Sequence, residues 1–187
     1  DNANSSYKYY AEGAPVAQWY LHEWVGVDPM TGDPLWKYAD GTISHVAPES
    51  NYATSQANKF VKGTALPDLY GSLNNSLFYK NFELNFMFTF ALGSRMMNST
   101  RATLLTYTNT DANNLGKEVL SMWQIPGQET DIPKLNNSSI VNGYDYTTAI
   151  TTTRFLEDNS YLRLKNVTLT YNVPQRFLIR AKTFKQL

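Results

Sequence analysis

Few residues of this sequence are of the types that commonly do chemistry, and their spacing argues against an active site. The chain has no cysteine and only two histidines, His22 and His45, neither of them close in spacing to a second metal ligand or base. Glu157 and Asp158 are adjacent, so on a strand their carboxylates point to opposite faces and cannot act as an acid–base pair. We therefore expect no enzyme, no metal site and no cofactor, with both histidines exposed or at an interface.

Two groups of residues have side chains that bind ligands in other proteins. Asp111, Asn113 and Asn114 offer oxygen atoms to calcium, but no bidentate carboxylate follows at the spacing of a calcium loop. The tryptophans could stack on sugar rings, whereas the simpler interpretation is anchoring at an interface or packing in loops. They are Trp19, Trp24, Trp36 and Trp123. Of these, we take Trp36 and Trp123 as the candidate contacts with a ligand or a partner.

The composition excludes several classes of protein. The 187 residues carry 16 basic and 16 acidic side chains, and a net charge of zero gives no electrostatic footprint for nucleic acid. No apolar run approaches the roughly 20 residues that a transmembrane helix needs. A transmembrane β-strand stays open, because it needs only about 9–11 alternating residues. Low charge and 14% aromatic residues favour a β-rich chain.

The clearest element is a β-hairpin between residues 68 and 92. From residue 83 onward every even position is large and apolar, which is the period of a strand with one apolar face. These positions are Leu84, Phe86, Phe88, Phe90 and Leu92. Lys80-Asn81 is the expected two-residue turn, with Asn81 taking the positive φ. We predict that the apolar face contacts lipid; the alternative is that it forms the core of a soluble β-sandwich.

A second long strand is predicted over residues 160–171. Its apolar positions change parity around Lys165-Asn166, so we expect a β-bulge there. Tyr161 and Tyr171 stand ten residues apart, roughly 25 Å along a membrane normal for a tilted strand. That spacing fits the two aromatic girdles of an outer-membrane barrel.

The rest of the chain gives weaker signals. We expect a strand over residues 16–25, turns between 28 and 34, and a short helix within 115–123. Residues 38–66 and 93–154 are expected to be loops. A loop of about sixty residues is unusual in a compact soluble domain but ordinary on the outer side of a membrane barrel.

Four stretches of the sequence resemble the C-terminal barrel region of SusC/RagA-type TonB-linked outer-membrane proteins. The last stretch is long and highly specific, and the order and spacing of all four fit from Val16 to Pro174. The stretches are GVDPMTGDPL at 26–35, YKNFEL at 79–84, Trp123 followed by TDIP at 130–133, and RFLEDNSYLRLKNVTL at 154–169.

This resemblance implies a fold, a location and a function. The fold is an all-β, antiparallel segment of a 22-stranded transmembrane outer-membrane β-barrel with long extracellular loops. The family imports glycans or peptides across the bacterial outer membrane, with a plug, a TonB box that engages TonB, and a SusD-like surface lipoprotein as partner. Neither the plug nor the TonB box is present, and both ends look cut, so residues 1–187 are expected to be a fragment of the barrel domain.

The resemblance and the loop lengths together imply a topology. Short turns lie on the periplasmic side of such barrels and long loops lie outside. Lys80-Asn81 is therefore expected at the periplasmic side, and residues 93–154 outside, available to the lipoprotein. The alternative function is a soluble β-sandwich that acts as a carbohydrate-binding module.

Overall fold

The strands of this chain form two separate compact units. The computed structural model describes residues 8–48, 57–105, 114–135, 140–141, 144–145 and 152–177. Each unit takes two stretches of the chain: unit 1 is Asp1–Leu66 with Ser94–Asp158, and unit 2 is Pro67–Gly93 with Asn159–Leu187. The named strands all pair antiparallel and the helices are few and short. The predicted all-β, antiparallel class is therefore confirmed, although the sheets do not close into a barrel within this chain.

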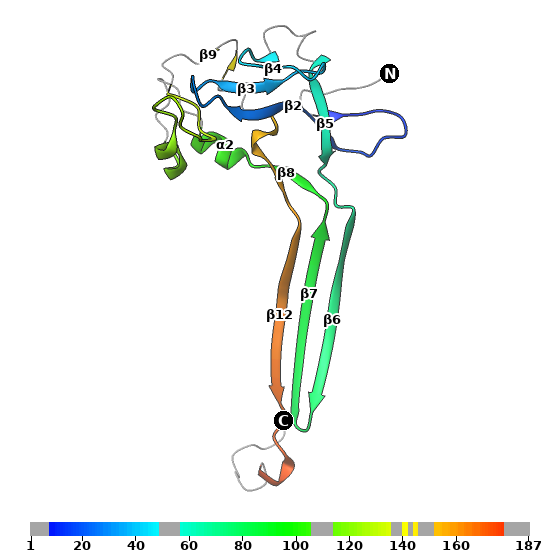
Figure 1. The fold of residues 1–187 in the computed structure, drawn as a ribbon. Helices are drawn as coiled ribbons and strands as arrows, with labels where there is room; N and C mark the ends of the chain where they lie inside the picture. The colour runs from blue at the N-terminus through cyan, green and yellow to red at the C-terminus, as the bar shows by residue number, and fades with distance from the viewer. Residues whose placement is uncertain are drawn as a thin grey trace. The chain divides into compact units, whose positions relative to one another are not determined.

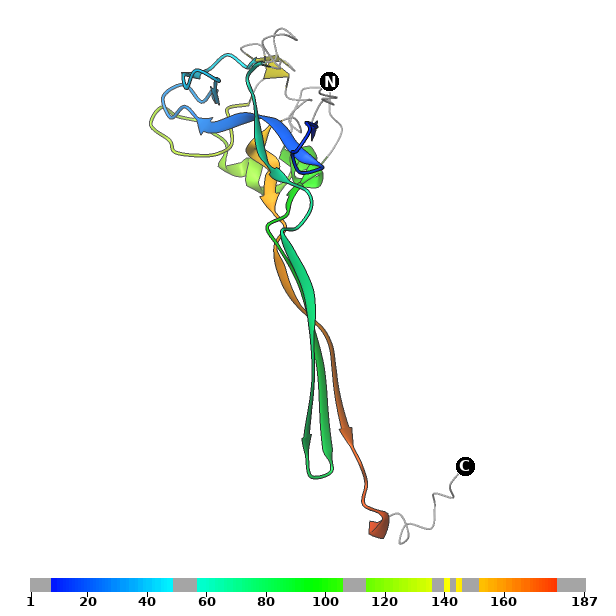
Figure 2. The ribbon, with the colours of Figure 1, turned by 90° about the vertical axis from the view of Figure 1, so that its right-hand side faces the viewer.

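Unit 2 contains one three-stranded antiparallel sheet. Its strands are β6 (Leu69–Tyr79), β7 (Phe82–Leu92) and β12 (Tyr161–Tyr171), in the order β12-β7-β6 (Figure 1). Seen from the side, the three strands form a thin single layer (Figure 2). The middle strand is β7, the one with the strictest alternation in the sequence.

The predicted hairpin is confirmed, but the conformation of its turn is not the expected one. Tyr79 pairs with Phe82, which leaves Lys80-Asn81 as the two-residue connection. The positive φ, 54°, falls on Lys80 instead of Asn81. A lysine tolerates this region less readily than an asparagine, so the twist of the flanking strands overrides the local preference.

The predicted β-bulge is also confirmed. The register between β12 and β7 shifts between Leu164 and Asn166, so Lys165 is the extra residue. Without this shift, the leucines before the bulge and the apolar residues after it would lie on opposite faces of the sheet.

Unit 1 is built from several small sheets and short helices. A five-stranded sheet contains β1 (Lys8–Tyr9), β2 (Gln18–Val27), β3 (Pro34–Lys37), β4 (Ile43–Ser44) and β5 (Lys59–Thr64). Two strand pairs accompany it: β8 (Arg95–Met97) with β11 (Leu156–Asp158), and β9 (Ile140–Val141) with β10 (Tyr144–Asp145). The short helices are α2 (Ser99–Leu105), η2 (Lys117–Ser121) and η4 (Thr153–Phe155).

The core of unit 1 shows that the two predicted long loops are wrong. Residues 38–66 contain β4 and β5, and residues 93–154 contain α2 and η2, which pack together. The core draws its side chains from both stretches of the unit: Trp36, Ala47, Ala102, Leu105, Val119, Ile132 and Phe155. Each of these elements is too short to show an apolar period of its own, because its buried side chains meet partners distant in sequence.

The remaining predicted elements need small corrections. The strand expected at 16–25 runs from Gln18 to Val27, since Ala17 takes a positive φ of 63°. The helix expected within 115–123 is a single 3₁₀ segment, η2. No helix among the described residues has both the length and the apolar character to cross a bilayer.

Candidate functional sites: an apolar sheet face and a polar cluster

The first candidate site is one face of the sheet in unit 2. Residues directly opposite in an antiparallel pair project to the same side. Phe88 lies between Leu73 on β6 and Leu164 on β12, and the same holds along β7. Leu84, Phe86, Phe88, Phe90 and Leu92 therefore share a face with Leu69, Leu73, Leu77, Leu162, Leu164, Val167 and Leu169. The one polar side chain at these registers is Asn75, opposite Phe86.

The opposite face of the same sheet is polar. Met87 pairs with Asn74 and Asn166, and Asn85 pairs with Ser76 and Thr168. The Asn85 amide also donates to the Glu83 carboxylate over 2.9 Å. One sheet layer therefore separates an apolar environment from a polar one.

The apolar face is open to its surroundings. The exposed fraction is 57% for Leu73, 71% for Leu162 and 66% for Leu169. A contiguous apolar surface of this extent indicates a site that contacts another protein or a membrane. One end of this face carries aromatic residues, where Phe82 packs against Tyr171 with ring centroids 4.7 Å apart. Tyr161, expected in the second girdle, pairs with Ala91 and lies on the polar face, because the bulge between the two tyrosines reverses the parity.

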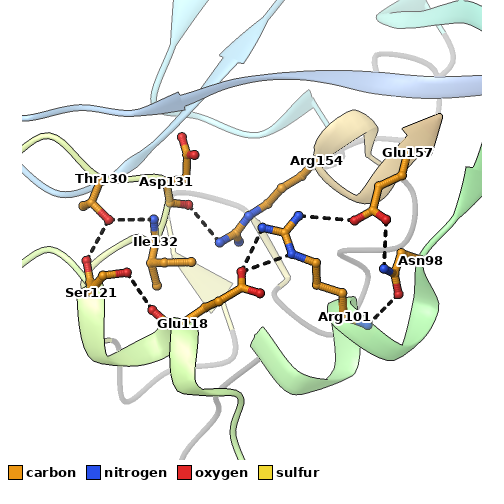
Figure 3. A network of polar contacts seen from close by, with 9 residues as sticks. All are labelled: Asn98, Arg101, Glu118, Ser121, Thr130, Asp131, Ile132, Arg154 and Glu157. Carbon is orange, nitrogen blue, oxygen red and sulfur yellow. Dashed lines mark hydrogen bonds and ion pairs between the residues drawn. The ribbon is translucent and has the colours of Figure 1, made fainter.

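The second candidate site is a polar cluster in unit 1 (Figure 3). Arg101 on α2 donates from Nε and Nη2 to one oxygen of Glu118, at 3.1 and 2.9 Å. It also pairs with Glu157 at 3.4 Å, and Glu157 accepts a hydrogen bond from the Asn98 amide at 2.9 Å. Arg154 donates to the backbone carbonyl of Asp131 at 2.9 Å. The cluster thus ties β11, α2, η2 and the 130–132 segment together.

The hydrogen bonds between Arg101 and Glu118 affect the ionisation of the Glu118 carboxyl group. The Arg101 hydrogen bond holds the pKa of Glu118 below its ordinary value, so this carboxylate stays ionised. A cavity of about 200 Å³ opens beside the cluster, lined by Trp24, Arg101, Asp131, Ile132, Thr153 and Arg154. Since both arginines are engaged by oxygen acceptors, the cluster holds the unit together and supplies no obvious nucleophile or base.

The turn between β2 and β3 is fixed by the segment that follows η2. Trp123 donates its indole N–H to the Pro29 carbonyl at 2.8 Å and covers Gly32. Lys134 pairs with Asp33 at 3.0 Å. At the start of the turn, two hydrogen bonds hold the pKa of Asp28 below its ordinary value. The larger effect comes from the backbone N–H of Met30 and the smaller one from the His45 side chain. Residues that the resemblance assigned to separate stretches therefore meet at one place.

The structure separates the two tryptophans chosen as candidate contacts. Trp36 is 1% exposed and packs edge-on against Trp24 at 5.1 Å, so its environment is that of a core residue. Trp123 is half-buried, with one side against Gly32. Trp123 and η2 both pack within unit 1, since Val119 of η2 belongs to its core and the Trp123 ring covers Gly32.

The two histidines also lie in different surroundings. His22 is fully buried on β2, which contradicts the prediction that it is exposed or at an interface. His45 is partly exposed and bonds to Asp28 at 2.7 Å. No three His, Asp or Glu side chains gather into a metal-binding group within the part of the chain that the structure describes. Asp111 and Asn113 of the weighed calcium motif lie outside that part.

Sequence reasoning missed the arginine cluster. Arg101 and Arg154 are 53 residues apart, and their acceptors come from three further segments. A possible signal was Arg154 at the head of the longest family-like stretch, but nothing in the sequence pointed to Arg101.

An all-β segment with one apolar and one polar sheet face is the arrangement of a membrane-barrel wall, and comparison with known proteins agrees. No family model matches the chain. It is 28% identical over 184 residues to TonB-dependent receptor P3 of Formosa agariphila, covering 89% of this chain and 16% of that protein. It is 32% identical over 114 residues to TonB-dependent receptor P26 of the same organism, covering 61% of this chain and 11% of that one.

Solved structures give the same result. The RagAB peptide transporter matches with a TM-score of 0.69 and 26% identity, over 92% of this chain and 18% of the matched chain. The RagAB importer in its open-open state matches with a TM-score of 0.70 over 94% of this chain. The predicted resemblance to SusC/RagA-type proteins is therefore confirmed. The chain spans less than a fifth of the length of these relatives.

Proposed function

We propose that this chain is part of a TonB-dependent outer-membrane importer that takes up peptides or glycans. The observation that carries the proposal is the sheet of unit 2, in which apolar side chains predominate on one face and amides, hydroxyls and charges on the other. Strands of about 11 residues with this alternation have the length and polarity of a barrel wall between lipid and a polar lumen. The similarity to TonB-dependent receptors supports it.

The alternative function, a soluble β-sandwich that binds carbohydrate, needs a second sheet on the apolar face. Within the described part of unit 2, the strands form one layer, and the leucines that β6 and β12 place on its apolar face are half or more exposed. Packing against a second sheet would bury those side chains. Lipid is the environment that fits them without further protein.

In this proposal residues 1–187 are a fragment of the barrel domain. Leu84, Phe86, Phe88, Phe90 and Leu92 face lipid, and the turn at Lys80-Asn81 lies at the periplasmic side. Unit 1 then belongs to the outer side, because the chain enters it from the other end of β7. Its compactness suits an extracellular cap better than a set of separate loops.

The partners follow from the relatives. RagAB is named as a peptide transporter, and this supports peptides as one cargo of the present protein, with a SusD-like surface lipoprotein and TonB as partners. Trp123 is the tryptophan we propose for partner contact. The burial of Trp36 favours a packing role for that residue instead.

Fractionation of cells that express the full-length protein tests the location and the class. The protein should be recovered with the outer membrane and should need detergent for extraction. Recovery as a soluble monomer would support the carbohydrate-binding sandwich and overturn the importer. Uptake should also stop when TonB is deleted, since import in this class depends on that energy coupling.

A further inference from the structure

A shallow groove in unit 1 has no role in the proposal above. It runs between the edge of β2 and the segment that follows Gln128, and its volume is about 440 Å³. Residues 25–27 with Pro29 form one wall, and residues 129–131 form the other. One wall is therefore a strand edge and the other carries two acidic side chains.

The strand edge borders this groove at Val27, a residue that is 9% exposed. Asp28 donates its N–H to Asp33 at 2.9 Å, so Asp28 faces β3 across the turn. Backbone groups alternate along a strand, and Val27 therefore points its N–H and C=O away from β3. Its partner is Pro34, which has no N–H to offer, as expected at a non-hydrogen-bonded position. Val27 can thus pair with another extended backbone.

Only part of this edge is available. The N–H of Trp24 donates to the Thr153 hydroxyl at 3.0 Å, which closes the edge on that side. The turn at Asp28 closes it on the other. The open stretch accommodates a few residues, which suits a short peptide better than a long strand.

The acidic wall differs from several acidic groups of unit 1 that are already engaged. Glu23, Asp33, Glu118 and Glu157 lie in ion pairs, and Asp28 bonds to His45. Glu129 and Asp131 are exposed, and no ion pair engages either carboxylate among the described residues. Figure 3 shows the Asp131 carboxylate turned away from Arg154, which contacts only the backbone carbonyl of that residue.

We propose that this groove binds a short extended peptide that carries lysine or arginine. The peptide backbone pairs with the N–H and C=O of Val27, as in the addition of a strand to a sheet edge. Its cationic side chains pair with Glu129 and Asp131, and an apolar side chain contacts Val25, which is 44% exposed. This inference rests on the proposed import function and names one class of cargo for it, namely cationic peptides.

Binding to the purified full-length receptor in detergent tests the charge preference. The probes are a labelled pentapeptide with blocked ends, Val-Lys-Val-Lys-Val, and its twin with glutamate in place of lysine. The lysine peptide should bind at low salt and weaken as salt is added, because exposed charges are screened. The glutamate peptide should bind at least about tenfold more weakly. Equal affinity for the two peptides would overturn the proposal.

Single variants locate the binding. Glu129→Gln and Asp131→Asn should each weaken the lysine peptide by up to about fivefold, the range of an exposed ion pair. Glu12→Gln is the matched control, since Glu12 is exposed and lies outside the groove. It removes the same charge and should leave the affinity unchanged. Similar losses in all three variants would mean nonspecific attraction, and this too would overturn the proposal.

Methylation of the peptide nitrogens, one at a time, tests the strand-edge pairing without any change in the protein. At least one position should abolish binding while the two lysines are kept. A peptide that still binds after methylation at every position would exclude pairing with Val27.

The outcomes separate this inference from the proposed function. If the receptor resides in the outer membrane and imports nutrient but does not bind the peptide, only this inference is wrong. If the receptor is found in the soluble fraction, the proposed function itself is wrong.

Discussion

Single side chains hold unit 1 together through charge, and this makes its stability depend on pH. Glu118 has a pKa below its ordinary value because Arg101 donates hydrogen bonds to it. Asp28 has a lowered pKa because the N–H of Met30 and then His45 stabilise its charge. A carboxyl group with a lowered pKa stabilises the fold above its unfolded pKa, and the contribution disappears as the pH falls through the folded value.

We therefore expect the stability of unit 1 to fall below about pH 4. Between about pH 5 and 8 the stabilising contributions of the Glu118 and Asp28 carboxylates should stay constant, because both remain ionised. The measurement is hydrogen exchange over residues 114–135 of the full-length protein, corrected for the intrinsic rate at each pH. Glu118→Gln should exchange faster at neutral pH and change less on acidification. An acid response identical to that of the wild type would show that the Arg101 pair does not stabilise the unit.

A second residue-scale expectation concerns Gly32. Its φ is +74°, and an added Cβ would lie 2.5 Å from the Trp123 ring. Gly32→Ala should displace the Trp123 ring. It should also weaken the 3.0 Å hydrogen bond that the backbone N–H of Trp123 donates to the Ile132 carbonyl. Gly127→Ala is the control, because φ is +91° there and nothing lies within 4 Å of the added atom. Both variants carry the backbone penalty of about 1 kcal/mol, and only Gly32→Ala adds the clash.

Hydrogen exchange at Trp123 separates the two effects. Protection of its amide should fall in Gly32→Ala and stay near the wild-type value in Gly127→Ala. Equal protection in both variants would mean that the indole does not depend on close approach to Gly32.

At the scale of elements, the two faces of β7 should respond differently to the same charge. Phe88 lies between two leucines on the apolar face, and Met87 lies between two asparagines on the other. In the intact barrel, Phe88→Lys should lower the free energy of unfolding by about 2–4 kcal/mol if it lies near the bilayer midplane. Met87→Lys should lower it by much less. Denaturant titration in lipid vesicles measures both, and equal losses would contradict the assigned orientation.

The bulge offers a sharper test of the same sheet. Deletion of Lys165 removes the extra residue and forces one-to-one pairing of β12 with β7. Leu164 and Val167 are then two positions apart, so the apolar residues on both sides of the deletion stay on the apolar face. The Lys165 deletion should therefore still assemble into a protease-resistant barrel, whereas deletion of both Lys165 and Asn166 should abolish assembly, because it places Leu164 and Val167 on opposite faces. Failure of the single deletion to assemble, or normal assembly of the double deletion, would contradict the assigned register.

The sheet of unit 2 could be predicted from the sequence, and the reason is local. Each strand carries its own alternating pattern, so Phe86, Phe88 and Phe90 identify a face without knowledge of any partner. The elements of unit 1 could not be predicted in this way. Trp36, Val119 and Phe155 come from three short segments, and each of them is buried only because the three segments meet in one core. The groove beside Val27 was beyond reach for the same reason, since its walls are about one hundred residues apart.

For the whole molecule, the connection of the strands gives a topology that labelling can test. The chain leaves β7 and returns to β12 at one end of the sheet, and the Lys80-Asn81 turn lies at the other. A cysteine at Ile125, which is 66% exposed, should react with a membrane-impermeant maleimide on intact cells. A cysteine at Lys80 should not react until the outer membrane is opened. The reverse result would invert the topology.

The division of unit 2 between two stretches of chain has a consequence for the order of folding. The hairpin of β6 and β7 needs a connection of two residues, but β12 must wait for a loop that spans residues 93–160 to close. Closing so long a loop is entropically unfavourable and slow. The pairing of β8 with β11 brings Arg95 opposite Asp158. These two residues are only a few positions along the chain from Ala91 and Tyr161, which pair at the end of the β7–β12 ladder. Once unit 1 has formed, the remaining closure is short, and β12 can be added to the hairpin as the last strand.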